Sequence, residues 1–256
     1  IGQIYYAGVY VEKNIEKAIY YYKLAADGNN VFAQWGLFNI YYHGKYNPKN
    51  IELSLHYLEQ AANNNYTMAQ FTIGSFFLLN IHFPTNLKKA FYYLNLAANK
   101  NHFDAQKYLG LLFLRDDFDQ CDINKAIHYL TLAANNNNDK DAQYHLGKIF
   151  SDGKKVKPDM EKAVHYLTLS ANQNFMPAMS ELGNILYEGK GVERNILKGI
   201  YYLNCAAKFN HPVAQYNLAT VYLNGGFIPR DVNKAIYYFS LSADQNYASS
   251  QRALGL

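Results

Sequence analysis

The sequence has little charge and no long apolar run. Among its 256 residues 17% are charged, and a net charge of +4 comes from 24 basic and 20 acidic side chains. Such a small, scattered charge gives no support for nucleic acid as the ligand. The longest apolar stretch, Ile73 to Phe83, is interrupted by Asn80 and His82 and is far shorter than the roughly 20 residues of a membrane-spanning helix. We expect neither nucleic-acid binding nor direct membrane insertion.

Cysteine is also scarce. The two cysteines, Cys121 and Cys205, lie far apart in the sequence, so a disulfide between them is not expected. This favours the cytoplasm as the compartment. Both are interpreted as plain small residues and not as nucleophiles.

The sequence does contain one pattern that recurs about every 36 residues. The repeat is marked by doublets of small residues, spaced 36, 36, 36, 37, 36 and 36 residues apart: Ala25-Ala26, Ala61-Ala62, Ala97-Ala98, Ala133-Ala134, Ser170-Ala171, Ala206-Ala207 and Ser242-Ala243. A period of this length is typical of a solenoid, in which each unit buries its apolar face only against its neighbours.

Each repeat predicts two helices. The second begins after an Asn or Asp that is a good N-cap, at Asn14, Asn50, Asn86, Asp122, Asp159, Asn195 and Asp231. It carries a tyrosine at one repeat position, at Tyr21, Tyr57, Tyr93, Tyr129, Tyr166, Tyr202 and Tyr238. It ends at an asparagine suited to the left-handed conformation, at Asn29, Asn65, Asn101, Asn137, Asn174, Asn210 and Asn246. The first helix follows, usually with a glycine that lets its partner helix approach closely.

These residues resemble the Sel-1-like repeat, a relative of the tetratricopeptide repeat. The best copy runs from Leu182 to Gly199 and keeps Gly189-Lys190-Gly191-Val192 intact. The resemblance implies an all-α, right-handed α/α solenoid of about seven 36-residue helix-turn-helix repeats. It also implies a non-catalytic adaptor whose partner is another protein or a peptide segment. Two alternatives stay open: a regulatory or targeting arm of a larger enzyme such as a protein kinase, and a hydrolase like the cysteine-rich bacterial relatives, whose disulfide framework is missing here.

Residues 1–256 are expected to form a single repeat array. Gly2 and Gly255 occupy the same repeat position, so we expect a slice of a longer protein, truncated in mid-repeat at both ends. A secretory compartment therefore stays possible, because a signal peptide would lie outside the slice.

No catalytic, cofactor or metal site is predicted. His56, His128 and His165 share one repeat position, but no carboxylate or cysteine recurs beside them to complete a metal-binding set. They are interpreted as part of a solvated face.

The predicted partner-binding surface is a groove lined by the first helices, which form the concave side in tetratricopeptide-type repeats. It is aromatic toward the N-terminus and polar toward the C-terminus. Its predicted contact residues are Phe32, Trp35, Tyr42, Phe71, Leu78, Lys107, Arg115, Tyr144, Lys148 and Tyr187. The alternative is that Trp35 and Phe71 pack against adjacent helices.

A second surface is predicted on the outer face of the second helices. There Tyr or His alternates with Leu or Cys, in the pairs Tyr20/Leu24, Tyr92/Leu96, His128/Leu132, His165/Leu169, Tyr201/Cys205 and Tyr237/Leu241. Such a strip can mediate self-association.

Overall fold

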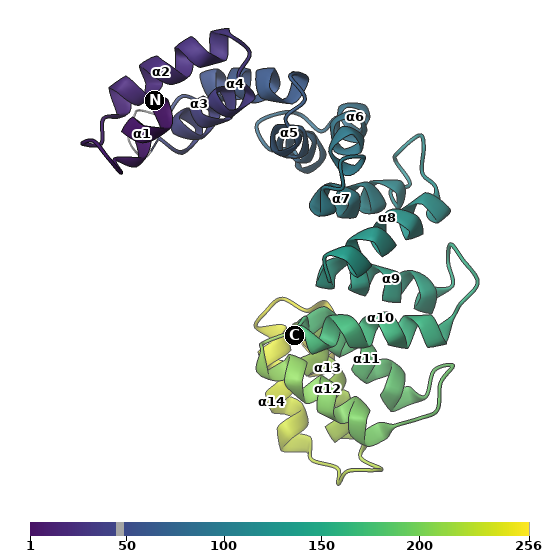
Figure 1. Cartoon of the computed structure of the whole chain (residues 1–256). Coiled ribbons are helices and arrows are strands. Elements are labelled where there is room, and N and C mark those ends of the chain that lie inside the picture. Colours follow the sequence, from purple (N-terminus) through teal and green to yellow (C-terminus); the bar gives the residue numbers. More distant parts are fainter. Residues whose placement is uncertain (45–48, 256) are drawn as a thin grey trace. The chain divides into compact units, whose positions relative to one another are not determined.

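The computed structural model describes residues 1–44 and 49–255, and these residues form fifteen α-helices and no strand (Figure 1). The first helices of the repeats are α1 (Gly2–Ala7), α3 (Val31–His43), α5 (Thr67–Leu79), α7 (Phe103–Phe113), α9 (Lys140–Asp152), α11 (Met176–Glu188), α13 (Pro212–Asn224) and α15 (Ala248–Leu254). The second helices are α2 (Ile15–Asp27), α4 (Ile51–Asn63), α6 (Leu87–Ala98), α8 (Ile123–Asn136), α10 (Met160–Asn172), α12 (Ile196–Lys208) and α14 (Val232–Ala243). The predicted all-α repeat fold is confirmed.

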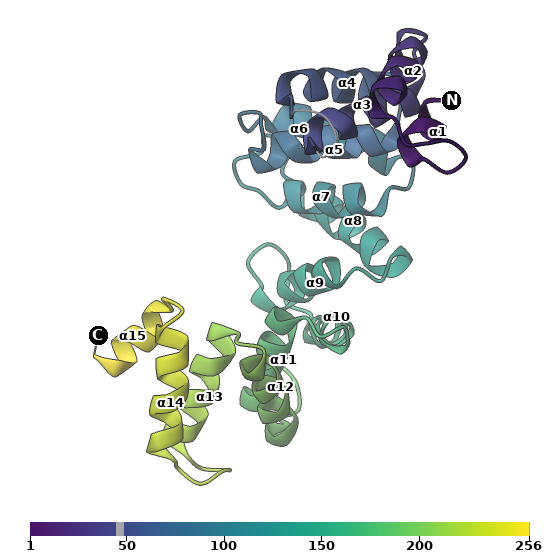
Figure 2. The same cartoon turned by 90° about the vertical axis from the view of Figure 1, so that its left-hand side faces the viewer.

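The helices form two compact units, Ile1–Tyr129 and Leu130–Leu256. Within each unit, helices that follow one another in the chain pack together, and Figure 2 shows this succession clearly for α13, α14 and α15. First helices of consecutive repeats are also in contact, as α5 is with α7 and α11 with α13. These two contacts place first helices side by side, one pair in each unit.

All seven predicted N-caps are confirmed. The Asn14 Oδ1 accepts a hydrogen bond from the Lys17 backbone N–H at 2.9 Å, and Asp231 does the same for Lys234. These bonds satisfy backbone donors that the first turn of a helix leaves without an intrahelical partner. The N-cap residue thus determines where each second helix begins.

Six of the seven predicted helix stops are confirmed, with positive φ at Asn29, Asn65, Asn101, Asn174, Asn210 and Asn246. The prediction for Asn137 is wrong, because the left-handed residue in that repeat is Asn138, with φ 50°. The repeat carries one extra residue, and α8 is accordingly 14 residues long, against 12 or 13 for the other second helices. The insertion therefore moves the stop along by one residue.

The glycine of the first helix brings the two helices of a repeat together. A Cβ added at Gly147 would lie 2.6 Å from the Leu167 Cγ, and one at Gly183 would lie 2.9 Å from the Leu203 Cγ. Both leucines are fully buried. Close packing of this kind leaves no room for a side chain at the glycine.

The recurring tyrosine is explained by ring stacking between the two helices. Six tyrosines lie parallel to an aromatic ring of the first helix, with centroids 5.8 to 6.4 Å apart, in the pairs Tyr5–Tyr21, Tyr41–Tyr57, Phe77–Tyr93, Phe113–Tyr129, Phe150–Tyr166 and Tyr222–Tyr238. The recurring lysine at the start of the second helix lies over the first-helix ring in five repeats, as Lys89 does over Phe77 at 5.0 Å. Stacking and cation–π contacts thus reinforce each helix pair.

Candidate functional site

A hollow of about 330 Å³ opens on the first-helix face of the N-terminal unit. Residues of α1, α2 and α3 line it: Gln3, Tyr6, Tyr22, Phe32, Trp35, Gly36, Asn39 and His43. The Tyr22 ring lies against two glycines, Gly2 and Gly36. A Cβ added at either glycine would lie only 2.9 or 3.2 Å from a ring atom of Tyr22. Of the predicted contact residues, Phe32 and Trp35 line this hollow and Tyr42 is not among the lining residues.

Polar groups in this hollow are oriented by internal hydrogen bonds. The Tyr22 hydroxyl donates to the Gln3 Oε1 at 3.2 Å, and the Asn39 Nδ2 donates to the Trp35 carbonyl at 2.8 Å. Phe32 is 69% exposed, so its ring is available to a ligand.

A second hollow of about 250 Å³ opens in the C-terminal unit. It is lined by Asn184, Tyr187, Glu188, Leu203, Tyr216, Asn217, Thr220, Val221 and Asn224, from α11, α12 and α13. Asn184 has the repeat position of Asn39, and Tyr187 has that of Tyr6. The same repeat positions therefore line a hollow in both units.

The aromatic side chains predicted as partner contacts also pack against the next repeat. Ring centroids are 5.6 Å apart for Trp35–Tyr66 and 4.5 Å for Phe71–His102. The pair Tyr144–Phe175, at 5.5 Å, continues the pattern. The alternative interpretation of Trp35 and Phe71 is thus confirmed, although both remain partly exposed. The partner ring is contributed by the residue before the first helix, a position that the sequence analysis did not single out.

Two other predicted contact residues, Leu78 and Tyr42, differ in exposure. Leu78 is buried, with 8% of its surface exposed, whereas its neighbour Leu79 is 50% exposed. Leu78 therefore belongs to the core and cannot anchor a ligand without rearrangement. Tyr42 is partly exposed, lies 3.1 Å through its hydroxyl from the His82 Nε2, and has Lys49 over its ring at 5.6 Å.

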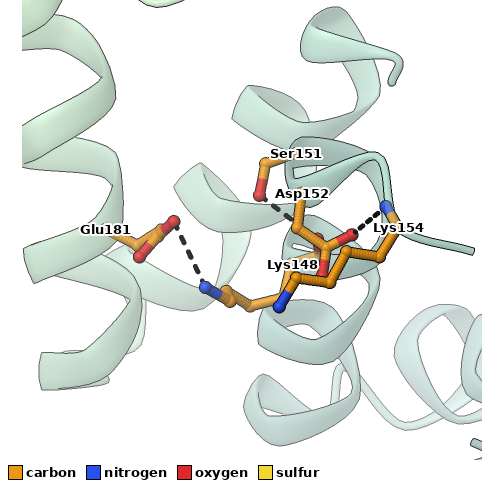
Figure 3. Close-up of polar contacts among 5 residues, drawn as sticks. All are labelled: Lys148, Ser151, Asp152, Lys154 and Glu181. Carbon is orange, nitrogen blue, oxygen red and sulfur yellow. Dashed lines mark hydrogen bonds and ion pairs between the residues drawn. The ribbon is translucent and has the colours of Figure 1, made fainter. Parts of the chain in front are cut away.

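The basic residues predicted at the polar end are each paired with an acid. Lys107 lies 3.7 Å from Asp104, and Arg115 binds Asp117 through two bonds of 2.8 and 2.6 Å. Figure 3 shows Lys148 of α9 reaching toward Glu181 of α11, with Nζ 3.4 Å from Oε1. In the same view Ser151 donates to the Lys148 carbonyl at 3.2 Å, and the Lys154 backbone N–H donates to Asp152 at 3.0 Å. A charged ligand must compete with these internal pairs.

Tyr187 is partly exposed, and Arg194 lies beside it. The guanidinium carbon is 5.7 Å from the ring centroid, and the Arg194 Nε donates to the Tyr187 carbonyl at 2.8 Å. Tyr187 also lines the second hollow.

Burial shifts the pKa of several groups near this face. It lowers the pKa of His102 and of His211, each of which accepts a backbone N–H bond through Nδ1 at the start of a first helix. It raises the pKa of Tyr144. The Arg115 guanidinium lowers the pKa of the Asp117 carboxyl. The two histidines thus cap first helices, and Asp117 pairs with Arg115.

The described ranges contain no cluster of three metal-ligating side chains. Within the same ranges, no helix is both long and apolar enough to cross a bilayer.

The outer face of the second helices carries the predicted strip. Tyr20, Tyr92, Tyr201 and Tyr237 are 57 to 62% exposed, and Leu24 is 55% exposed. The other members at the Leu position are partly buried. The strip is therefore accessible mainly through its tyrosines and histidines.

The fold defines an α/α repeat protein with a hollow on the first-helix face of each unit. The model of the Sel1 repeat family matches residues 1–30, 31–66, 73–102, 103–138, 140–175, 177–210 and 212–247, and the chain belongs to this family. Proteins with Sel1 repeats generally mediate protein–protein interactions and are typically non-catalytic. No curated protein matches the chain.

Two solved structures show the same fold. A protective antigen of uropathogenic Escherichia coli strains, described as displaying an SLR fold, is 24% identical with a TM-score of 0.86. The alignment covers 99% of this chain and 54% of that protein, so this chain spans about half of its length. A Sel1 repeat protein from Oxalobacter formigenes is 27% identical with a TM-score of 0.78, over 98% of this chain and 72% of that one.

Proposed function

We propose that this chain is a non-catalytic scaffold or adaptor whose first-helix face binds a segment of a partner protein. The observation that carries this proposal is the recurrence of a hollow at the same repeat positions in both units. A repeat fold that presents the same lining positions in more than one repeat is suited to binding segments of a protein partner.

Aromatic side chains supply the expected binding energy. Phe32 is the most exposed of them, while Trp35, Tyr42, Phe71, Tyr144 and Tyr187 are partly exposed. Aromatic residues that become buried at an interface dominate its affinity. Lys107, Arg115 and Lys148 each already have an acidic partner. A charged ligand group has to displace that partner, so these residues would contribute specificity and association rate more than affinity.

The test is selection of binding peptides from a displayed random library on the intact chain. Asn39→Arg and Asn184→Arg each place a bulky charge at a hollow, and each should weaken binding of the selected peptides at that hollow at least about tenfold. Tyr20→Arg, on the exposed face of α2, is the matched control and should leave binding unchanged. Binders that are insensitive to both asparagine variants but sensitive to the control would place the interaction on the outer face.

Phe71→Ala is a poor test of ligand binding to the first-helix face, because Phe71 also packs inside the protein. Phe71 stacks on His102 at 4.5 Å and lies 5.8 Å from Tyr108, so its removal also disrupts packing between repeats. Phe32→Ala is preferable, because most of the Phe32 side chain faces solvent.

A further inference from the structure

A glutamine near the start of the first helix contacts the turn after the next second helix in four places. Its side chain is buried, and its Oε1 accepts a hydrogen bond from the side chain thirty residues later in the sequence. Both residues of each contact belong to the same compact unit. We call these contacts polar joints; they are 2.8 to 3.1 Å long and pair Gln34 with Asn64, Gln70 with Lys100, Gln143 with Gln173 and Gln215 with Gln245.

Each polar joint also includes the left-handed asparagine that ends the previous second helix. The Gln215 Nε2 donates to the Asn210 Oδ1 at 2.9 Å and to the Ala207 carbonyl at 3.4 Å. The Gln245 Nε2 donates to the same Asn210 oxygen at 3.1 Å. This joint therefore fastens the end of α12 to the end of α14, and equivalent bonds do so in the other three joints.

The donor of a polar joint varies in type, but it always carries an N–H group. Asn64, Gln173 and Gln245 donate through an amide. Lys100 donates through its ammonium group instead. Gln106, in the repeat with the extra residue, keeps its Oε1 buried without a hydrogen-bond partner among the described residues. An acceptor left in this way costs stability, so the donor is the part of the joint that matters most.

One repeat has lost the joint. Met179 stands where the other repeats have the glutamine, and Phe209 stands thirty residues later. Neither side chain has an N–H donor. Met179 is buried, whereas Phe209 is 58% exposed, so burial of the phenylalanine ring does not replace the missing hydrogen bonds. The ends of α10 and α12 therefore lack the side-chain bonds that connect the ends of α12 and α14.

We propose that polar joints lock consecutive repeats together and that the Met179–Phe209 pair is an unlocked joint, at which the C-terminal unit opens more readily than at its two polar joints. Each interface of a repeat protein contributes separately to stability, so an interface without these bonds opens at a lower free energy. Opening there moves the end of α12 away from the end of α10 while α12 and α14 stay connected. The unlocked joint is thus a built-in place for a change of spacing between repeats.

Native-state amide hydrogen exchange of the intact chain tests this proposal. The backbone N–H groups of Asn65, Asn174 and Asn210 make equivalent hydrogen bonds of 2.9 to 3.1 Å in three turns. Asn65 lies between two polar joints, whereas the other two asparagines lie on either side of the unlocked joint. After correction for intrinsic rates, the amides of Asn174 and Asn210 should exchange at least about tenfold faster than that of Asn65.

Installing the missing joint is the sharper experiment. Met179→Gln alone provides an acceptor without its donor, and Phe209→Gln alone provides a donor without its acceptor, so neither should slow exchange. The two glutamines together can pair, and they should slow exchange at Asn174 and Asn210 at least about threefold beyond the product of the single effects. The amide of Asn65 is the internal control and should not change. Circular dichroism verifies that each variant is folded.

Breaking an existing joint should give the complementary result. Gln173→Ala leaves the buried Gln143 Oε1 without its donor, so the urea midpoint should fall by at least about 0.3 M. Gln173→Lys keeps an N–H donor, as Lys100 does in its own joint, and should stay close to the wild type. Phe209→Ala, at the same repeat position but outside a polar joint, is the matched control and should be nearly neutral.

Three results would each overturn the proposal. The first is equal exchange at Asn65, Asn174 and Asn210 in the wild type. The second is a Met179→Gln, Phe209→Gln protein in which the two effects are simply additive. The third is a Gln173→Lys protein as unstable as Gln173→Ala, which would mean that the donor does not hold the joint.

Discussion

At the scale of single residues, asparagine has two different roles in this chain. At Asn14 its side chain accepts a backbone N–H and begins a helix, whereas at Asn174 the backbone adopts φ 57° and ends one. The first role needs a side-chain oxygen, and the second needs tolerance of the left-handed region. Alanine satisfies neither requirement, so the two roles can be tested separately.

Asn174→Ala should destabilise the protein by about 1 kcal/mol, because its Cβ disfavours positive φ. Asn174→Gly should be within about 0.5 kcal/mol of the wild type, since glycine adopts this conformation freely. Asn172→Ala, inside the last turn of α10, is the control and should be neutral or slightly stabilising. Urea unfolding measures all three. Equal stability of the Asn174→Ala and Asn174→Gly proteins would contradict the assigned role.

His211 should make stability depend on pH. Burial lowers its pKa in the folded state, and its Nδ1 must stay unprotonated to accept the Ala214 N–H at 3.3 Å. The unfolded chain, with a pKa of about 6.5, therefore binds the proton first as pH falls. The contribution is fully present above about pH 6.5 and is lost progressively below it, until the pH reaches the lowered pKa of the folded state.

His211→Asn keeps a capping oxygen but removes the titrating group. We expect the loss of urea midpoint between about pH 7.5 and pH 5.5 to be smaller in this variant than in the wild type. Equal losses in the two proteins would show that His211 does not contribute to the pH dependence.

At the scale of elements, the closest approach between α11 and α12 depends on two glycines. A Cβ at Gly199 would lie 2.6 Å from the Tyr187 backbone nitrogen and 2.8 Å from the Gly183 carbonyl oxygen. Backbone atoms of a packed helix cannot move aside as the end of a flexible side chain can. Alanine or serine stands at this repeat position in the other copies, so the pair α11–α12 has a packing of its own.

Gly199→Ala should therefore destabilise the protein by about 1–3 kcal/mol, the usual cost of overpacking. Gly28→Ala is the matched control, because the nearest atom to its Cβ would be the Ala25 carbonyl oxygen at 3.4 Å. That change should stay within about 0.5 kcal/mol. Thermal and urea unfolding compare the two, and a Gly199→Ala protein as stable as the control would mean that the helices separate at little cost.

At the scale of the whole molecule, the same repeat exposes two different surfaces. The first-helix face carries the hollows, and the second-helix face carries the strip of exposed tyrosines. We propose that the strip mediates self-association, because exposed apolar residues that recur in line on a folded protein commonly mark an interface.

Tyr201→Glu combined with Tyr237→Glu should lower the mass measured by light scattering at high protein concentration. Phe227→Glu is the control, since Phe227 is 71% exposed in the loop between α13 and α14 and does not belong to a second helix. A wild-type protein that stays monomeric over the whole concentration range would exclude self-association through this face.

The sequence alone determined the repeat, the helices and their ends. Caps and stops depend on local chemistry, and a residue such as Asp231 acts on a backbone group only three positions away. The inserted residue before Ala142 shows the limit of this approach, because periodicity placed the stop at Asn137 and the chain placed it at Asn138.

The tertiary structure decided which groove residues are accessible. Leu78 and Leu79 are adjacent residues of the same type, yet packing buries Leu78 and exposes Leu79. Trp35 stacks on Tyr66 from the next repeat, and Gln3 lines a hollow with residues of α2 and α3. Exposure and ring contacts depend on distances between residues about a repeat apart. A one-dimensional pattern gives the position of a residue on its helix but not the separation between helices, and that separation determines where a ligand can enter.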